Sequence, residues 1–217
     1  DSKVGMYVYN SPEYAETNFA AMKIGGVPIN VNYRYLDEEL HYLLENADIE
    51  ALVFHSSLGD RVARVCDRLP MLKAMICVDD GPAEDGSMGP INGVPYDIFL
   101  SQASGTARTQ PKGDEIYMLY TGGTTGMPKG VMYPLDSFTD FFMRGFPPMI
   151  GLDPFENADQ FAPAARQMID TNSAVVAMSG PPLMHGTGCW LGLMFPHMLG
   201  GTSVLLENRG FKPEEVW

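Results

Sequence analysis

The chain has 217 residues, in which 14 lysines and arginines stand against 27 aspartates and glutamates, for a formal net charge of -13. This acidic balance disfavours nonspecific binding to nucleic acid or to an anionic membrane surface. A hydrophobic content of 45% is typical of a soluble globular protein, and the absence of any run of 18 apolar residues argues against a transmembrane helix.

The three cysteines, Cys66, Cys77 and Cys189, are odd in number and lack the Cys-x-x-Cys spacing of zinc sites. They favour neither a disulfide framework nor a metal site, and they predict reduced thiols in a cytoplasmic protein. The sequence starts without Met and stops just after Pro213, which is typical of the first turn of a helix. We therefore interpret the chain as a fragment of a longer protein.

Short apolar runs alternate with segments of helical periodicity in the first 78 residues. Strands are expected at 5–9, 27–31, 51–54 and 74–78, and helices at 11–24, 36–47 and 58–69. In the first helix we expect Ala15, Phe19 and Met22 to face the core. The alternation predicts an α/β fold, with mainly parallel sheets flanked by helices and ligands bound at the carboxyl ends of the strands.

The second half of the chain is more irregular. Residues 79–114 predict a long surface excursion with one short element near 96–102, followed by a buried strand at 116–120. Six of the 11 phenylalanines lie in the segment 137–161. This Phe-rich insertion is expected to pack on its own domain; the alternatives are a wall of an apolar tunnel and a patch that contacts a membrane or another subunit. Further elements are expected as follows: a strand at 173–178, a helix at 188–199 and a strand at 202–206.

The loop that follows the strand at 116–120 concentrates glycines, threonines and one lysine. Glycines allow successive backbone N–H groups to surround an anion, and Lys129 adds a positive charge. The spacing excludes a Walker A loop, because Gly126 is followed by Met-Pro-Lys-Gly rather than by the residues that motif requires. The stretch therefore predicts a polyphosphate site of another class.

Residues 120–131, with the sequence Tyr-Thr-Gly-Gly-Thr-Thr-Gly-Met-Pro-Lys-Gly-Val, resemble the phosphate loop of the adenylate-forming enzymes. This family includes acyl-CoA synthetases, adenylation domains of peptide synthetases and beetle luciferases. Gly122 departs from the family pattern, which commonly has Ser there. The resemblance implies that the nucleotide phosphates are bound by the following residues: Thr121, Gly122, Gly123, Thr124, Thr125, Gly126 and Lys129.

A second segment, Pro181–Gly188, places His185 in a tight turn before a helix. The residues alone favour a structural histidine, as they do for His41, His55 and His197. The segment is, however, similar to the Pro-Leu-x-His-x-x-Gly motif of the same family. By this resemblance His185 lies near the acyl carboxylate and gates the path to the thiol site, while Gly186 and Gly188 leave room for substrate.

The resemblance extends over the whole chain and implies an incomplete acyl-CoA synthetase-like N-terminal domain. A first α/β lobe would span residues 1–170 and carry the phosphate loop at 121–130, and a truncated second lobe would start at 171–217. The family residues for Mg²⁺, for ribose and for the adenylation lysine would lie beyond Trp217, so no metal ligand is assigned here. The fragment alone is expected to be inactive.

The function implied for the parent protein is ATP-dependent activation of a hydrophobic carboxylic acid, a fatty or sterol-side-chain acid, followed by transfer to coenzyme A. ATP, Mg²⁺ and coenzyme A would be required. Three alternatives stay open: an acyl-AMP ligase, an adenylation domain that serves a carrier protein, and a non-catalytic nucleotide-binding module. No nucleic-acid partner is expected, and a homodimer or a peripheral membrane contact is left open.

Overall fold

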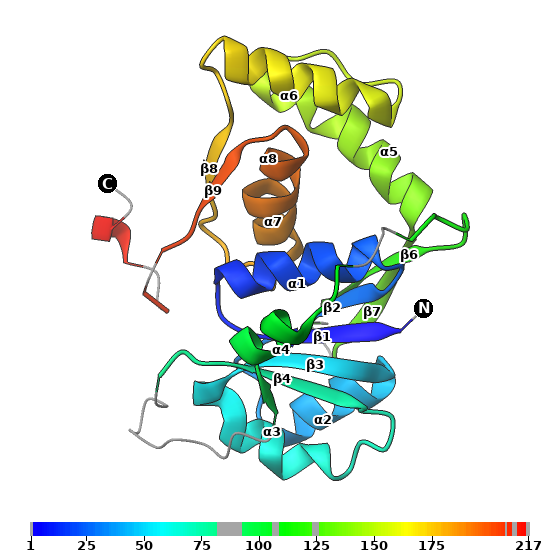
Figure 1. The fold of residues 1–217 in the computed structure, drawn as a ribbon, viewed down its shortest axis with the longest axis vertical. Helices are drawn as coiled ribbons and strands as arrows, with labels where there is room; N and C mark the ends of the chain where they lie inside the picture. The colour runs from blue at the N-terminus through cyan, green and yellow to red at the C-terminus, as the bar shows by residue number, and fades with distance from the viewer. Residues whose placement is uncertain are drawn as a thin grey trace. The chain divides into compact units, whose positions relative to one another are not determined.

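The structure is a computed structural model that describes residues 2–81, 93–105, 109–122, 126–206, 208–209 and 212–215 (Figure 1). By their contacts the residues divide into two compact units, Asp1–Met132 and Tyr133–Trp217. The lobe boundary expected near residue 170 concerns the complete protein and stays a prediction.

The first unit is built on a five-stranded sheet in the order β2-β1-β3-β4-β5, with every neighbouring pair parallel. The strands are β1 (Lys3–Tyr7), β2 (Val27–Asn30), β3 (Ile49–His55), β4 (Ala74–Val78) and β5 (Val94–Pro95). The chain runs from β1 to β2 on one side and then crosses to β3 on the other, which makes the carboxyl edge between β1 and β3 a topological switch point. The predicted parallel sheet is therefore confirmed.

Four helices accompany this sheet: α1 (Pro12–Lys23), α2 (Asp37–Asn46), α3 (Gly59–Cys66) and α4 (Tyr96–Gln102). Figure 1 shows α1 on one side of the sheet and α2 and α3 on the other. Ser11 caps α1, since its Oγ accepts the Tyr14 N–H at 3.3 Å, and Gly25, at a φ of 75°, ends it. Leucines of α2 and valines of α3 form the core with the sheet residues Ile29 and Phe54.

The buried face of α1 differs from the one expected. Tyr14, Thr17, Asn18 and Ala21 are buried, whereas the helix face of Ala15, Phe19 and Met22 is only partly buried. The expectation was wrong because the face that is buried includes the polar Thr17 and Asn18, while the apolar face is the less buried one. Hydrophobic periodicity alone therefore does not distinguish the two faces.

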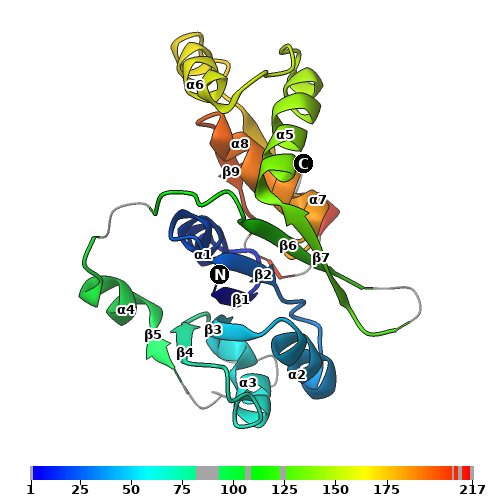
Figure 2. The ribbon, with the colours of Figure 1, turned by 90° about the vertical axis from the view of Figure 1, so that its right-hand side faces the viewer.

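A separate two-stranded sheet pairs β6 (Ile116–Thr121) with β7 (Lys129–Pro134). Residues Tyr117 to Tyr120 are buried one after another, as expected for a strand covered on both faces. Helix α5 (Leu135–Gly145) follows β7 directly and is the first helix of the second unit (Figure 2).

The second unit contains the parallel pair β8 (Val176–Met178) and β9 (Thr202–Val204). Its other elements are α6 (Phe161–Asp170), α7 (Gly186–Cys189), a π-helical turn (Trp190–Met194), α8 (Phe195–Met198), and 3-10 turns at Pro147–Ile150, Ala158–Gln160 and Pro213–Glu215. The helix expected at 188–199 thus appears as three consecutive pieces. A Cβ at Gly192, in the π turn, would lie 2.4 Å from the Ser179 Cβ, so only glycine allows this approach.

The Phe-rich segment packs on its own unit. Phe138 contacts Phe142 at a centroid distance of 4.9 Å, and Phe146 stacks on Phe195 at 5.1 Å. Phe141 differs from the other five phenylalanines of the segment, because half of its surface is exposed. A tunnel-wall role for this segment stays a prediction.

Asn18 provides a test of the packing of α1. Its side chain is 1% exposed, and within the described part of the chain neither Oδ1 nor Nδ2 has a hydrogen-bond partner. Such a group costs about 1–3 kcal/mol of stability, so Asn18→Leu should raise the thermal unfolding midpoint of the full-length protein. The matched control is Asn30→Leu, which removes an amide whose Oδ1 and Nδ2 are both hydrogen-bonded and should lower the midpoint. A comparable loss in both variants would contradict the prediction.

Candidate functional site

The predicted phosphate loop connects two paired strands. Thr121 is the last residue of β6 and Lys129 is the first residue of β7, and both side chains are exposed. Gly122 and Gly126 are exposed as well, whereas Gly123, Thr124 and Thr125 lie outside the described residues. The structure thus brings the two ends of the loop together on neighbouring strands.

The backbone of Tyr120, just before the loop, is bonded to a side chain of the first sheet. The Asn30 Nδ2 donates to the Tyr120 carbonyl at 2.9 Å, and the Tyr120 N–H donates to the Asn30 Oδ1 at 2.8 Å. Asn30 is the last residue of β2 and only 7% exposed. One amide therefore satisfies both backbone groups of Tyr120 in a buried environment.

The side chain of Tyr120 is also fixed. Its hydroxyl donates to the Asn46 Oδ1 at 2.7 Å, at the end of α2. Burial, followed by the charges of Tyr42 and Asp48, raises the pKa of Tyr120 to about 12. The phenol therefore stays a neutral hydrogen-bond donor at physiological pH.

The ring of Tyr120 lies against the backbone of the strand that follows the loop. A Cβ at Gly130 would lie 2.8 Å from the Tyr120 Cε2 and 3.1 Å from the Met118 Sδ. Glycine is needed here because the ring is buried and its hydroxyl is bonded, so it has little freedom to move. Tyr120 thereby positions the residue next to Lys129.

Lys129 carries a positive charge that no carboxylate of the described residues neutralises. Within the described residues its ammonium group makes no ion pair, in contrast to Lys73, which binds Glu50 at 2.5 Å. In a chain with a net charge of -13, this exposed lysine places a positive charge beside a glycine-rich loop.

The second predicted segment forms one turn in the second unit. His185 is exposed and precedes the first residue of α7; its N–H donates to the Pro182 carbonyl at 3.0 Å and its own carbonyl accepts the Cys189 N–H at 2.9 Å. Gly186 is partly buried and Gly188 is buried. The loop at 121–130 and this turn are each described within their own unit.

Close packing in the turn explains why residue 188 is a glycine. A Cβ there would lie 2.3 Å from the Pro182 carbonyl oxygen and 2.6 Å from that of Pro181. The two carbonyls thus require a glycine for the turn to pack on the helix. Room for substrate at Gly188, which the family resemblance implies, stays a prediction.

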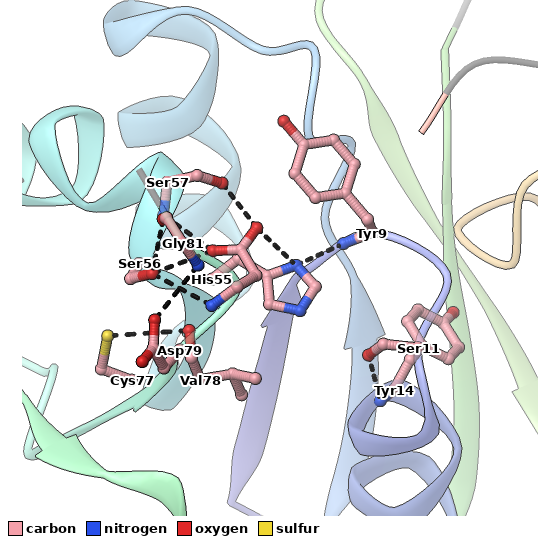
Figure 3. Close-up of polar contacts among 11 residues, drawn as sticks. Tyr9, Ser11, Tyr14, His55, Ser56, Ser57, Cys77, Val78, Asp79 and Gly81 are labelled. Carbon is pink, nitrogen blue, oxygen red and sulfur yellow. Dashed lines mark hydrogen bonds and ion pairs between the residues drawn. The ribbon is translucent and has the colours of Figure 1, made fainter. Parts of the chain in front are cut away.

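His55 confirms the interpretation of a packing histidine and shows how the carboxyl edge of the first sheet is held together (Figure 3). Its Nδ1 accepts the Tyr9 N–H at 3.0 Å, and its ring stacks on Tyr9. Asp80 accepts the Ser57 N–H at 2.9 Å and the Ser57 hydroxyl at 2.7 Å. These bonds tie the segments after β1, β3 and β4 to one another.

The sequence did not indicate that Asn30, Asn46 and Tyr120 form one hydrogen-bonded group. Asn30 lies within the strand expected at 27–31. The sequence offers one indication of a special role for it, which is a polar residue near the end of an apolar run. The partners are 90 and 74 positions apart in the chain, so no local pattern connects them.

Two features are absent from the part of the chain that the structure describes. No three His, Cys, Asp or Glu side chains lie close enough there to hold a metal ion. None of the helices in that part of the chain has the length and apolar character needed to cross a bilayer.

The chain is similar to known proteins over nearly its whole length. The family model described as "AMP-binding enzyme" matches residues 1–217. A 3-oxocholest-4-en-26-oate–CoA ligase of Rhodococcus rhodochrous is 35% identical over 99% of this chain and 37% of its own length. A medium/long-chain-fatty-acid–CoA/3-oxocholest-4-en-26-oate–CoA ligase of Mycolicibacterium smegmatis is 36% identical over all of this chain and 38% of its own.

A solved structure agrees in fold. The anthranilate CoA ligase AuaEII, in complex with anthranoyl-AMP, superposes with a TM-score of 0.68 at 21% identity, over 95% of this chain and 35% of that one. The fold, the phosphate loop and the family match lead to one conclusion: the chain belongs to the AMP-binding enzyme family. It spans 37–38% of the length of these two curated relatives.

The close contact at Gly130 gives a prediction. Gly130→Ala should destabilise the full-length protein by about 1–3 kcal/mol, because the added methyl group meets a ring that is held on two sides. Gly122→Ala is the control, since nothing lies within 4 Å of a Cβ there. Urea unfolding measures both. Equal midpoints would show that the Tyr120 ring moves freely.

Gly188 gives a second prediction. Gly188→Ala should lower the unfolding midpoint, because the methyl group would overlap two backbone carbonyl oxygens that cannot move independently. Gly180→Ala, at an open position just before the Pro181–Gly188 segment, should change the free energy of unfolding by no more than about 0.5 kcal/mol and leave the midpoint nearly unchanged. Thermal unfolding followed by circular dichroism compares them, and tolerance of Gly188→Ala would argue against the packed turn.

Proposed function

We propose that the complete protein activates a hydrophobic carboxylic acid with ATP and transfers the acyl group to coenzyme A. The observation that carries this proposal is the phosphate loop at 121–130, with the exposed Lys129 on one of its arms, in a chain of the AMP-binding enzyme family. The two curated relatives, both named CoA ligases, support the same reaction.

In the first half-reaction a carboxylate oxygen of the acid attacks the α-phosphorus of ATP. The bond to the β-phosphate oxygen breaks, pyrophosphate leaves with the electron pair, and an acyl-adenylate remains. Negative charge grows on the leaving phosphates, so positioned donors that lie around them lower the barrier.

The residues proposed to bind these phosphates are Thr121, Gly122, Gly123, Thr124, Thr125, Gly126 and Lys129. Threonine hydroxyls and backbone N–H groups would donate hydrogen bonds, and the Lys129 ammonium would follow the charge that builds on the leaving group. The paired strands β6 and β7 support this arrangement by keeping the two arms of the loop adjacent.

In the second half-reaction the thiol of coenzyme A attacks the acyl carbonyl carbon, the thiol proton is lost, and AMP leaves with the electrons of the former anhydride bond. We propose that His185 lies near the acyl carboxylate and gates the path between the acyl and thiol sites, with Gly186 and Gly188 beside it. Its exposed position before α7, held by the backbone bond to Pro182, is compatible with this role.

The proposed substrate class is a fatty acid or a sterol-side-chain acid, because the relatives act, by their names, on 3-oxocholest-4-en-26-oate and on medium to long fatty acids. Mg²⁺ would accompany ATP and reduce the negative charge of its phosphates. The described residues offer no carboxylate cluster for it, so no step is derived through the metal. The free thiols Cys66, Cys77 and Cys189 support a cytoplasmic location.

For the complete protein we also propose the lobe boundary near residue 170. A first lobe would span residues 1–170, and residues 171–217 would form the start of a second lobe.

The exchange of labelled pyrophosphate into ATP tests the activity directly. The full-length protein is assayed with short, medium and long fatty acids and with a sterol-derived acid, with and without coenzyme A. Exchange that requires an apolar acid, together with a thioester product, supports the proposal; absence of both from a folded, ATP-binding protein would overturn it.

Lys129→Ala should lower the rate of acid-dependent pyrophosphate exchange by about 10²–10³-fold, the usual effect of removing one positioned donor. The folded state should be preserved, because the side chain is exposed. Lys23→Ala is the matched control, since it removes the same charge from an exposed position at the end of α1. Exchange rates that agree between the two variants would remove Lys129 from the mechanism.

A further inference from the structure

We infer that Asn30 is a positioning residue for the phosphate loop, and that it acts on ATP through the backbone of Tyr120. This inference rests on the proposed function and deepens it, because it assigns a residue far from the loop in sequence to the adenylation step. Asn30 itself is not placed in contact with ATP.

The geometry selects an amide at this position. Tyr120 presents an N–H and a carbonyl to the same side chain, at 2.8 Å from the Asn30 Oδ1 and 2.9 Å from its Nδ2. A carboxylate could accept the N–H but would place a negative oxygen against the carbonyl, and an alanine would leave both buried groups unbonded. Among residues of this length, only asparagine offers one donor and one acceptor in this arrangement.

The bond pair connects two sheets that share no strand. β2 is an edge strand of the first sheet, whereas β6 belongs to the two-stranded sheet that carries the loop. The Asn30 side chain thus replaces a strand-to-strand ladder at this point, because its two bonds have the pattern of a ladder pair. The position and direction of β6 relative to β2 at Tyr120 therefore depend on the Asn30 side chain.

Tyr120 passes this placement on to both arms of the loop. Thr121 follows Tyr120 directly in the chain. The Tyr120 ring, whose hydroxyl is bonded to the Asn46 Oδ1 at 2.7 Å, lies where a side chain at Gly130 would be. Gly130 is bonded covalently to Lys129. A displacement of Tyr120 therefore moves Thr121 and Lys129 together.

Donors that are in place before the reaction stabilise a transition state without reorganisation, and small displacements reduce that stabilisation strongly. Loss of the Asn30 bonds should therefore weaken the step that uses the phosphates. The attack of a thiol on an acyl-adenylate that is already formed breaks no bond to pyrophosphate, so it should be affected little.

The experiment uses the full-length protein with Asn30→Asp and Asn30→Ala. The matched control is Asn32→Ala, which removes a nearby amide whose Oδ1 accepts the exposed Arg34 N–H at 2.9 Å in the loop after β2. The measured quantities are kcat and KM for ATP in pyrophosphate exchange, and the rate of thioester formation from synthetic acyl-adenylate and coenzyme A.

Both Asn30 variants should lose at least about tenfold in kcat/KM for ATP, while thioester formation from the supplied adenylate stays within about twofold of the unchanged protein. The control should resemble the unchanged protein in both reactions. Equal losses in the two half-reactions, or an unchanged kcat/KM for ATP, would overturn the inference.

A second measurement does not depend on the folding of a variant. Hydrogen exchange of the unchanged protein without nucleotide should find the Tyr120 amide protected, because the bond to Asn30 exists before ATP binds. Rapid exchange that slows only on ATP binding would contradict a loop that is positioned in advance. If the unchanged protein shows no acid-dependent exchange of pyrophosphate, the proposed function fails; if it does and the Asn30 variants match it, only this inference fails.

Discussion

A pair of buried hydrogen bonds between Asn30 and the backbone of Tyr120 is the interaction on which the candidate site depends. Backbone groups buried away from water must be bonded, and here a side chain takes the place of a neighbouring strand. The bonds join an edge strand of the five-stranded sheet to the strand that leads into the phosphate loop. The strand before the loop is thus held by the larger sheet, whereas the described residues of the loop itself are mainly exposed.

Close packing around the candidate site depends on glycines at several positions. Gly130 accommodates the ring of Tyr120, Gly188 accommodates two proline carbonyls, and Gly192 accommodates Ser179. In each case the missing Cβ lets a neighbouring group occupy the space at van der Waals distance. Glycine is therefore needed near the candidate site for two different reasons: backbone freedom within the loop and close packing beside it.

Much of the fold could be predicted from the sequence because it is encoded locally. The strand at Ala74–Val78 and the short helix at Tyr96–Gln102 coincide with the residues expected from apolar runs and turn residues. The buried face of α1 could not be predicted, since Tyr14 and Asn18 are buried by their position over the sheet rather than by a clear apolar stripe. The loop at 121–130 was recognisable from its composition, whereas its support through Asn30 and Asn46 was not, because those contacts arise only when distant segments fold together.

Gly122, where the family commonly has Ser, shows how such a scaffold separates folding from chemistry. It is exposed, and the space around it is open, so no packing requirement restricts its side chain. The two arms of the loop are held from outside, by the sheet and by Tyr120. A substitution at Gly122 should therefore affect stability little, and selection at this position acts through ligand binding.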